Sequence, residues 1–169
     1  MSGPTLRPAT LEDVAELSSL INLAYRVEDF FKIGDRTDEA DVLAAMESGP
    51  FLVLAHAAGH LVGSIHVEVR GDRGYFGMLS VHPDVQGTGL GRRLIDEAEN
   101  YCVRGGCGRI DLELVNLRKE LPAFYRKFGY RVIGTSPFPA VERTKLPCHF
   151  IVMSKPLVAE SGTAKEVAR

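Results

Sequence analysis

The chain has 169 residues, of which 45% are hydrophobic and 25% charged, and its formal net charge is −2. This length suits one domain with its own hydrophobic core, and the near-neutral charge argues against nucleic-acid binding, which needs a basic face. No apolar run approaches the roughly 20 residues that span a bilayer, no secretory signal is recognisable, and the three cysteines lack metal-ligand spacing, so we expect a cytoplasmic protein without membrane segment or metal.

The N-terminal third of the chain predicts a strand followed by two helices. Apolar residues recur at helical spacing after Thr10, which is a candidate N-cap. The second helix begins near Thr37 and is stopped by Gly49 and Pro50. The predicted elements are a strand at 5–7, a helix at 11–24, a loop at 27–35 and a helix from about 37 to 47.

Three strand-like runs follow and predict an antiparallel meander. In the second run, Ile65, Val67 and Val69 alternate with polar residues, which is the pattern of a strand with one buried face. The segment 71–74, Gly-Asp-Arg-Gly, is a hairpin signal between the second and third runs. The three predicted strands are 51–56, 61–70 and 75–81.

The last part of the chain alternates helices and strands. An amphipathic helix follows a glycine-rich turn and is closed by Gly105 and Gly106. The remaining predictions are a helix from 90 to about 101, a strand at 109–115, a short helix at 121–128, a strand at 130–134, a loop at 136–147, a strand at 149–155 and a disordered tail at 159–169.

This order of elements predicts one α/β domain over residues 1–158, with a mixed sheet and helices on its faces. The strands on either side of the glycine-rich turn form a β-α-β unit, so we expect them to be parallel. Among nucleotide sites, a P-loop needs a lysine that the turn lacks, and a dinucleotide fingerprint needs a glycine where Arg92 stands.

The glycine-rich turn itself predicts a phosphate site. It joins a strand to a helix, and the first N–H groups of a helix have no partner within it and lie at the positive end of its dipole. Glycines let the backbone aim several N–H groups at one anion, and Arg92 and Arg93 add positive charge. A glycine-rich connection without a ligand is the structural alternative. The turn reads Gln86-Gly87-Thr88-Gly89-Leu90-Gly91.

Two segments carry a family resemblance. Residues 78–94, with the pattern Gln-x-x-Gly-x-Gly, resemble the acetyl-CoA-binding segment of the GNAT superfamily of N-acyltransferases, and residues 123–130 resemble its second signature. The resemblance implies a mostly antiparallel sheet with a central splayed parallel strand pair and helices on both faces. It also implies transfer of an acetyl group from acetyl-CoA to a primary amine of a small molecule or peptide, and a homodimer through the last strands.

The resemblance further implies site residues. Tyr125 matches the tyrosine that lies near the CoA sulfur and acts as the acid, and a phenol with pKa near 10 is protonated at neutral pH; a core aromatic is the alternative. The strand before the turn would bind pantetheine, the turn the pyrophosphate, and an asparagine after the next strand would contact pantetheine. The implied cofactor-binding residues are Leu79, Ser80, Val81, Gln86, Gly87, Thr88, Gly89, Leu90, Gly91, Arg92 and Asn116.

The general base has several candidates. Glu68 is the first, His66 lies on the same strand face, and His149 on the last strand is another, while ordered water could also carry the proton. For each of these three side chains, a solvated strand face is the alternative. Glu28, Asp29 and Asp35 form either an acidic rim for a cationic amine or a solvated loop. For the whole domain, the alternative to an enzyme is a sensor that binds acyl-CoA without catalysis.

Overall fold

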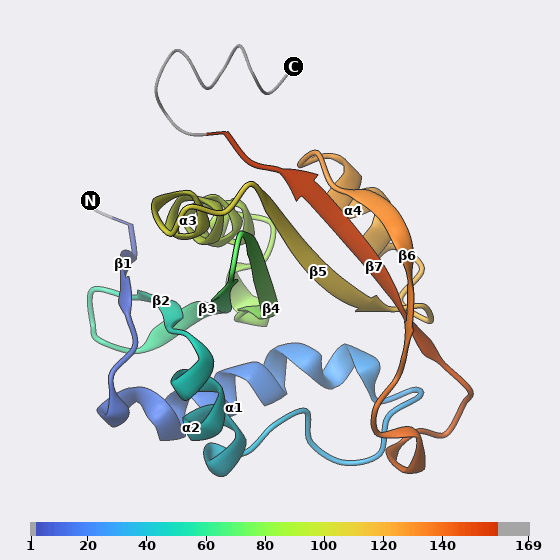
Figure 1. Ribbon diagram of the computed structural model, residues 1–169. Coiled ribbons are helices and arrows are strands. Elements are labelled where there is room, and N and C mark those ends of the chain that lie inside the picture. Colours follow the sequence, from blue (N-terminus) through green and yellow to red (C-terminus); the bar gives the residue numbers. More distant parts are fainter. Residues whose placement is uncertain (1–2, 159–169) are drawn as a thin grey trace.

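Residues 3–158, which this computed structural model describes, form a seven-stranded sheet with helices on both faces (Figure 1). The strand order is β1-β2-β3-β4-β5-β7-β6, and β4 and β5 are the parallel pair in an otherwise antiparallel sheet. The predicted fold class is therefore confirmed. The strands are β1 (Thr5–Pro8), β2 (Phe51–Ala55), β3 (Leu61–Arg70), β4 (Arg73–Val81), β5 (Arg109–Val115), β6 (Arg131–Pro137) and β7 (His149–Pro156).

Two hydrophobic clusters lie on opposite faces of the sheet. Helices α1 and α2 pack on one face with buried Leu17, Ile21 and Val42, while α3 and α4 pack on the other with buried Leu94 and Tyr125. Each cluster follows from the helical spacing of its apolar residues, which gives each helix one buried stripe. The helices are α1 (Val14–Ala24), α2 (Glu39–Ser48), α3 (Leu90–Arg104) and α4 (Leu121–Arg126), with short 3-10 turns η1 (Leu11–Asp13), η2 (Tyr25–Glu28), η3 (Pro83–Val85) and η4 (Val141–Arg143).

The parallel strands β4 and β5 separate soon after they meet. They are paired only over residues 73–75 and 109–111, and an ion pair of 2.8 Å between Arg73 and Asp111 lies at this joined end. Beyond Tyr75, the edge of β4 that faces β5 has no strand partner. Its backbone N–H and C=O groups there have no partner in β5. Because buried main-chain polar groups require hydrogen-bonding partners, these groups are available to a ligand.

A bulge in β4 accompanies this separation. The register with β3 shifts where Ser64 faces Ser80 and His66 faces Gly77, and between them Met78 adopts a φ of 51°. A bulky side chain is strained in the left-handed region. The bulge bends β4 away from regular pairing at the level where the two parallel strands diverge.

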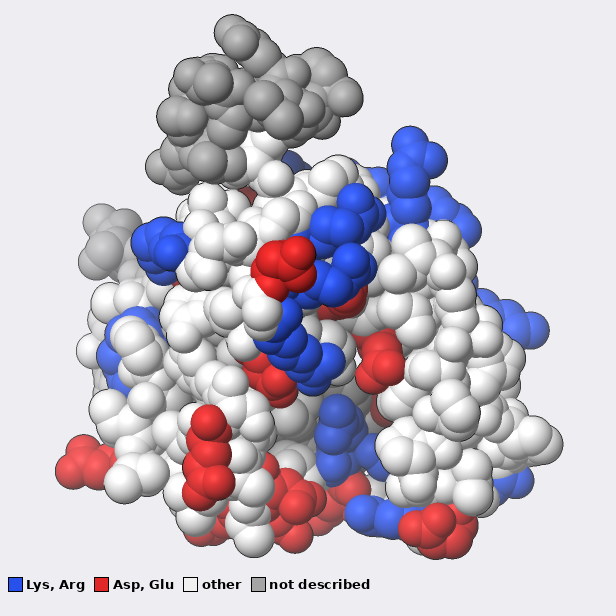
Figure 2. All heavy atoms as spheres, viewed as in Figure 1, with Lys and Arg blue, Asp and Glu red and all other residues white. Residues whose placement is uncertain are grey.

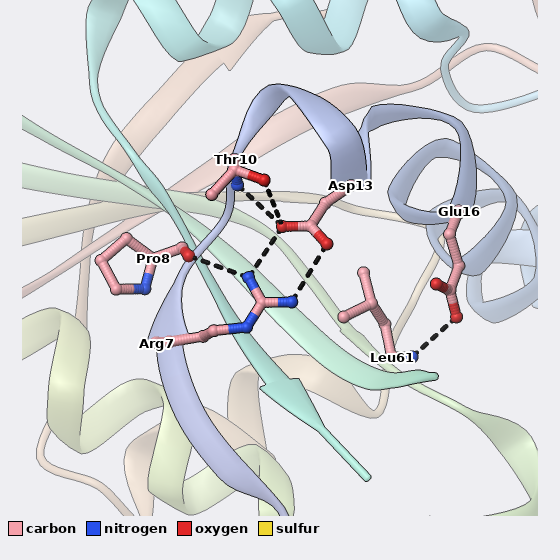
Figure 3. A network of polar contacts seen from close by, with 6 residues as sticks. All are labelled: Arg7, Pro8, Thr10, Asp13, Glu16 and Leu61. Carbon is pink, nitrogen blue, oxygen red and sulfur yellow. Dashed lines mark hydrogen bonds and ion pairs between the residues drawn. The ribbon is translucent and has the colours of Figure 1, made fainter. Parts of the chain in front are cut away.

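A polar network ties β1 to the first helix (Figure 3). The guanidinium of Arg7 donates to both carboxylate oxygens of Asp13, at 2.8 and 3.0 Å, and the backbone N–H of Thr10 donates to the same carboxylate at 2.7 Å. One turn later, Glu16 accepts from the backbone N–H of Leu61 at 2.7 Å. Thr10 is the N-cap of the first turn, Leu11–Asp13, as predicted, but this turn is 3-10, and α1 begins at Val14 with Asp13 as its N-cap.

We expect Asp13→Asn to destabilise the fold by about 1–2 kcal/mol at neutral pH, allowing for solvent screening. The hydrogen bonds from Arg7 lower the pKa of Asp13 from 3.8 to about 2, against the opposing effect of burial. Because the folded pKa lies below the unfolded one, this stabilisation is full above about pH 4 and disappears as the pH falls toward 2. Urea unfolding of both proteins between pH 2 and 7 should show the difference shrinking with acid; a constant difference would contradict the ionic origin.

Several predicted boundaries differ from the structure. The second helix begins at Glu39, with Asp38 accepting from the Asp41 N–H at 2.8 Å, because Thr37 is instead held by Asn22. Strand β6 continues to Pro137, and the hairpin loop before β4 is only Gly71-Asp72. The predicted tail at 159–169 lies outside the described residues, and within residues 3–158 no helix is long and apolar enough to cross a membrane.

Candidate active site

A cavity of about 950 Å³ occupies the space between the separated strands β4 and β5. It reaches both faces of the sheet, because its lining includes the glycine-rich turn and α4 from one face and the segment after α1 from the other. Figure 2 shows Lys and Arg side chains along a hollow near the middle of the viewed face, with acidic side chains beside them. The residues that line it include Tyr25, Glu28, Lys32, Arg36, Leu79, Gly89, Arg92, Arg118 and Tyr125.

The glycine-rich turn has the backbone conformation that a phosphate site needs. Gly87 and Gly89 have φ values of 81° and 87°, and a Cβ at either position would meet no atom within 4 Å. Glycine is therefore required by the left-handed backbone rather than by crowding, and the space beside the turn is open. Gln86 donates its side-chain N–H to the carbonyl of Val81 at 3.1 Å, which fixes the turn to the end of β4.

The N-terminus of α3 adds the positive end of a helix dipole. Gly89 is the N-cap, and no acidic side chain lies in the first helical turn to neutralise its free N–H groups. Arg92 lines the cavity and lies over the Phe128 ring at 5.2 Å. Arg93, which we expected at the same place, instead donates to the carbonyl of Pro4 at 2.8 Å. The turn, the helix end and one arginine together fit a pyrophosphate.

Most implied cofactor-binding residues meet at this cavity. Leu79 and Val81 line it from β4, at the edge that lacks a strand partner. Ser80 is 1% exposed and donates its hydroxyl to the Met78 carbonyl at 3.1 Å, so only its backbone can serve a ligand. The Thr88 hydroxyl donates to the Val85 carbonyl at 2.6 Å and shapes the turn. The remaining implied residues in the lining are Gln86, Gly87, Gly89, Leu90, Gly91 and Arg92.

Asn116 lies outside the residues that line the cavity. Its side-chain carbonyl accepts from the backbone N–H of His149 at 2.8 Å, and its own N–H donates to the His149 carbonyl at 2.9 Å. These two bonds join the end of β5 to the start of β7. The structure therefore gives Asn116 a role in holding the sheet together and does not bring it to the other implied cofactor-binding residues.

Tyr125 belongs both to the core and to the cavity. The residue is 5% exposed and lines the cavity from α4. Its ring packs against Phe124, Phe76 and Tyr130, with centroids 5.0, 6.0 and 6.0 Å away. Burial raises the pKa of Tyr125 well above its ordinary value, so the phenol stays protonated. Among residues 3–158 no group hydrogen-bonds its hydroxyl, which is free to donate into the cavity.

The side chains expected to supply the base lie away from the cavity. Glu68 accepts from Arg70 at 2.8 Å, and its carboxylate is 3.7 Å from His66 Nδ1. His66 is 3% exposed, and its Nε2 donates to the carbonyl of Ala45 in α2 at 2.8 Å. Strand alternation did place both side chains on one face. That face of β3, however, is covered by α2, and β4 stands between it and the cavity. His149 is exposed and also lies outside the lining.

The cavity wall on the α1 side carries charged side chains. Glu28 is 7% exposed and accepts from Arg118 at 3.1 Å. Burial raises the pKa of Glu28 although Arg118 opposes the shift. The expected acidic rim is not formed at this cavity, because Asp29 and Asp35 are exposed and line an adjacent hollow of about 320 Å³, which shares Lys32 with the cavity. Arg118 lies 90 residues from Glu28 in the chain, so no periodic pattern could have revealed this pair.

Two distant segments build this charged wall together. The backbone N–H of Ile33 donates to the Arg143 carbonyl at 2.8 Å, and that of Lys145 donates to the Phe31 carbonyl at 2.6 Å. The Lys145 ammonium also donates to the Asp29 carbonyl at 2.9 Å. The segment after α1 and the connection between β6 and β7 therefore form one structural unit beside the cavity.

Comparison with known proteins agrees with this arrangement. Residues 15–130 match the model of the acetyltransferase (GNAT) family. An acetyltransferase of Sodalis glossinidius is 34% identical over 95 residues, which cover 56% of this chain and 67% of that protein. The ribosomal-protein-S18-alanine N-acetyltransferase of Escherichia coli has a similar fold, with a TM-score of 0.74 at 17% identity over 94% of this chain and 96% of that one.

A second solved structure carries a cofactor. The yncA protein of Salmonella typhimurium, whose structure includes its cofactor acetyl-CoA, has a TM-score of 0.71 at 21% identity over 95% of this chain and 98% of that one. Fold and site thus define an acyl-CoA-dependent acetyltransferase. The chain belongs to the GNAT acetyltransferase family, whose members use acetyl-CoA.

Proposed function

We propose that this protein transfers the acetyl group of acetyl-CoA to a primary amine of a small molecule or peptide. The proposal depends above all on one continuous cavity that joins a phosphate-binding turn to Tyr125 and then to a charged wall on the opposite face of the sheet. Such a cavity allows a cofactor and an acceptor to enter from different sides and meet at the separated strands.

The chemistry needs an acid, a proton acceptor and a donor to the carbonyl oxygen. Acetyl-CoA supplies a thioester, and in the transfer a C–N bond to the amine forms while the C–S bond breaks. In this proposal, a backbone N–H group at the unpaired edge of β4 near Leu79 polarises the thioester carbonyl. The hydroxyl of Tyr125 protonates the departing thiolate. The proton of the amine passes to Glu28 or to water. Glu28 is the buried acid of the lining, whereas Asp41, Glu113 and Glu120 are exposed.

The decisive experiment is calorimetric titration with acetyl-CoA, followed by an amine panel in which free thiol is measured. Micromolar binding together with thiol release by any amine would support an enzyme. Binding without release by any amine would favour the alternative, a sensor that holds acyl-CoA without catalysis. The free hydroxyl of Tyr125 beside the cavity favours the enzyme. Absence of binding would overturn the proposed function.

We expect Glu28→Gln to lower kcat/KM for an amine acceptor by about 10- to 100-fold without changing acetyl-CoA affinity. The reason is that Glu28 is the buried carboxylate on the acceptor side, where it can attract an ammonium group or accept its proton. Asp29→Asn is the matched control, since Asp29 is the next residue, is exposed and lies outside this cavity. Equal losses in both variants would show that only the general charge of the segment matters.

A further inference from the structure

Three cationic side chains on the acceptor side of the cavity have no carboxylate partner. Lys32, Arg36 and Arg143 all line the cavity, and none of them forms an ion pair within residues 3–158. The Arg36 guanidinium lies 5.2 Å from the Tyr25 ring centroid, and Arg143 donates to the carbonyl of Asp35 at 3.1 Å. These contacts orient the two arginines but give neither of them a carboxylate partner.

Among the acids of the same cavity, Glu28 attracts Lys32 and Arg36 through its charge but forms an ion pair with neither. Glu28 and Glu120 are both bonded to Arg118, at 3.1 and 2.8 Å. Glu113 accepts from Ser136 at 2.9 Å, and Asp41 is exposed on α2. The acids therefore have other partners or lie in solvent, while the cations face the cavity.

The cations lie away from the turn that fits the pyrophosphate. Lys32 and Arg36 belong to the segment that follows α1, whereas the turn begins α3, and these two helices pack on opposite faces of the sheet. An anion bound by these side chains would therefore belong to the acceptor rather than to the pyrophosphate of the cofactor.

Lys32 in particular is held in an unfavourable environment. Its side chain is half-buried, and burial, followed by the nearby charge of Arg36, lowers its pKa to about 8, although the charge of Glu28 opposes the shift. A half-buried ammonium beside another cation is costly unless an anion compensates it. A bound carboxylate or phosphonate would supply the missing charge-assisted hydrogen bonds.

We propose that the acceptor is a small amine that also carries an anionic group, such as a carboxylate or a phosphonate. Its anionic group binds Lys32 and Arg36, with Arg143 nearby, while its amine lies toward Glu28 and the separated strands. This inference rests on the proposed acetyl transfer, and it narrows the acceptors to amines of the amino-acid type.

The test uses L-amino acids, their uncharged carboxamides and the corresponding aminophosphonates as probes, with the intact chain and saturating acetyl-CoA. We expect kcat/KM to favour an anionic amine over its carboxamide, and Lys32→Gln or Arg36→Gln to reduce that preference by about 10- to 100-fold. Added salt should weaken the preference as well. Arg26→Gln is the control, because Arg26 lies in the same segment but does not line the cavity.

A binding measurement separates this inference from the proposed function. Each probe is titrated into the complex with CoA, which cannot transfer an acetyl group. The inference would be supported if anionic amines bound more tightly than their carboxamides and Lys32→Gln abolished this difference, even if no probe were acetylated. Equal use of amines and carboxamides by all variants would overturn the inference and leave the transfer intact. Weaker acetyl-CoA binding in Lys32→Gln would also overturn it, because the cations would then serve the cofactor.

Discussion

Replacing Gly89 by valine is expected to weaken acetyl-CoA binding by at least about 100-fold. Gly89 has a φ of 87° and is the N-cap of α3, so a β-branched residue there must either strain the backbone or turn the helix N–H groups away from the anion. Its Cβ and methyl groups would also fill the open space beside the turn, where the pyrophosphate is expected. Isothermal titration of acetyl-CoA measures the loss directly.

Gly59→Val is the matched control for this experiment. Gly59 also has a left-handed backbone, with a φ of 104°, and a Cβ there would likewise meet nothing within 4 Å, but it lies in the turn between β2 and β3, outside the cavity. Both variants should lose roughly 1–2 kcal/mol of stability from backbone strain. If both, or neither, lost acetyl-CoA affinity, the glycine-rich turn would not be the specific phosphate site.

Tyr125→Phe is expected to lower kcat by roughly 100-fold or more while acetyl-CoA affinity is retained. The substitution removes only a hydroxyl that donates to no other described residue, so the ring packing against Phe76 and Phe124 should persist. Without this proton donor, the thiolate must leave unprotonated or take its proton from water. Steady-state thiol release, combined with calorimetry, separates the chemical step from binding.

Tyr130→Phe provides the comparison for Tyr125→Phe. Tyr130 is 1% exposed in the same aromatic cluster, but its hydroxyl donates to Glu99 at 2.8 Å and it lies outside the cavity lining. Its loss should therefore reduce stability by about 1 kcal/mol and leave kcat nearly unchanged. A fall in kcat that is equal in the two variants would assign Tyr125 to packing instead of acid catalysis.

Local sequence signals predicted the fold well, and they located the glycine-rich turn at the start of α3. The turn from Gln86 to Gly91 could be recognised because left-handed glycines, a strand and a helix start are close together in the chain. The parallel pairing of β4 and β5 followed from the β-α-β connection. Both depend on residues near one another, for which spacing is informative.

The charged wall on the α1 side of the cavity could not be predicted in the same way. The ion pair of Glu28 with Arg118 joins residues that the fold alone brings together. Alternation correctly placed Glu68 and His66 on one strand face, but it could not reveal that α2 covers that face. The left-handed conformation of Met78 also had no signal, because such a backbone normally calls for glycine.

The segment after α1 and the connection between β6 and β7 are joined by hydrogen bonds, so they are expected to change together as members of the family diverge. Backbone bonds from Ile33 to Arg143 and from Lys145 to Phe31 make the two stretches interdependent. Replacing one stretch by that of a relative with a different backbone path would disturb those bonds, whereas exchanging both would move the charged wall as one unit and leave the glycine-rich turn unaltered. New acceptor specificities should therefore arise, in nature or by grafting, through paired changes in these two stretches.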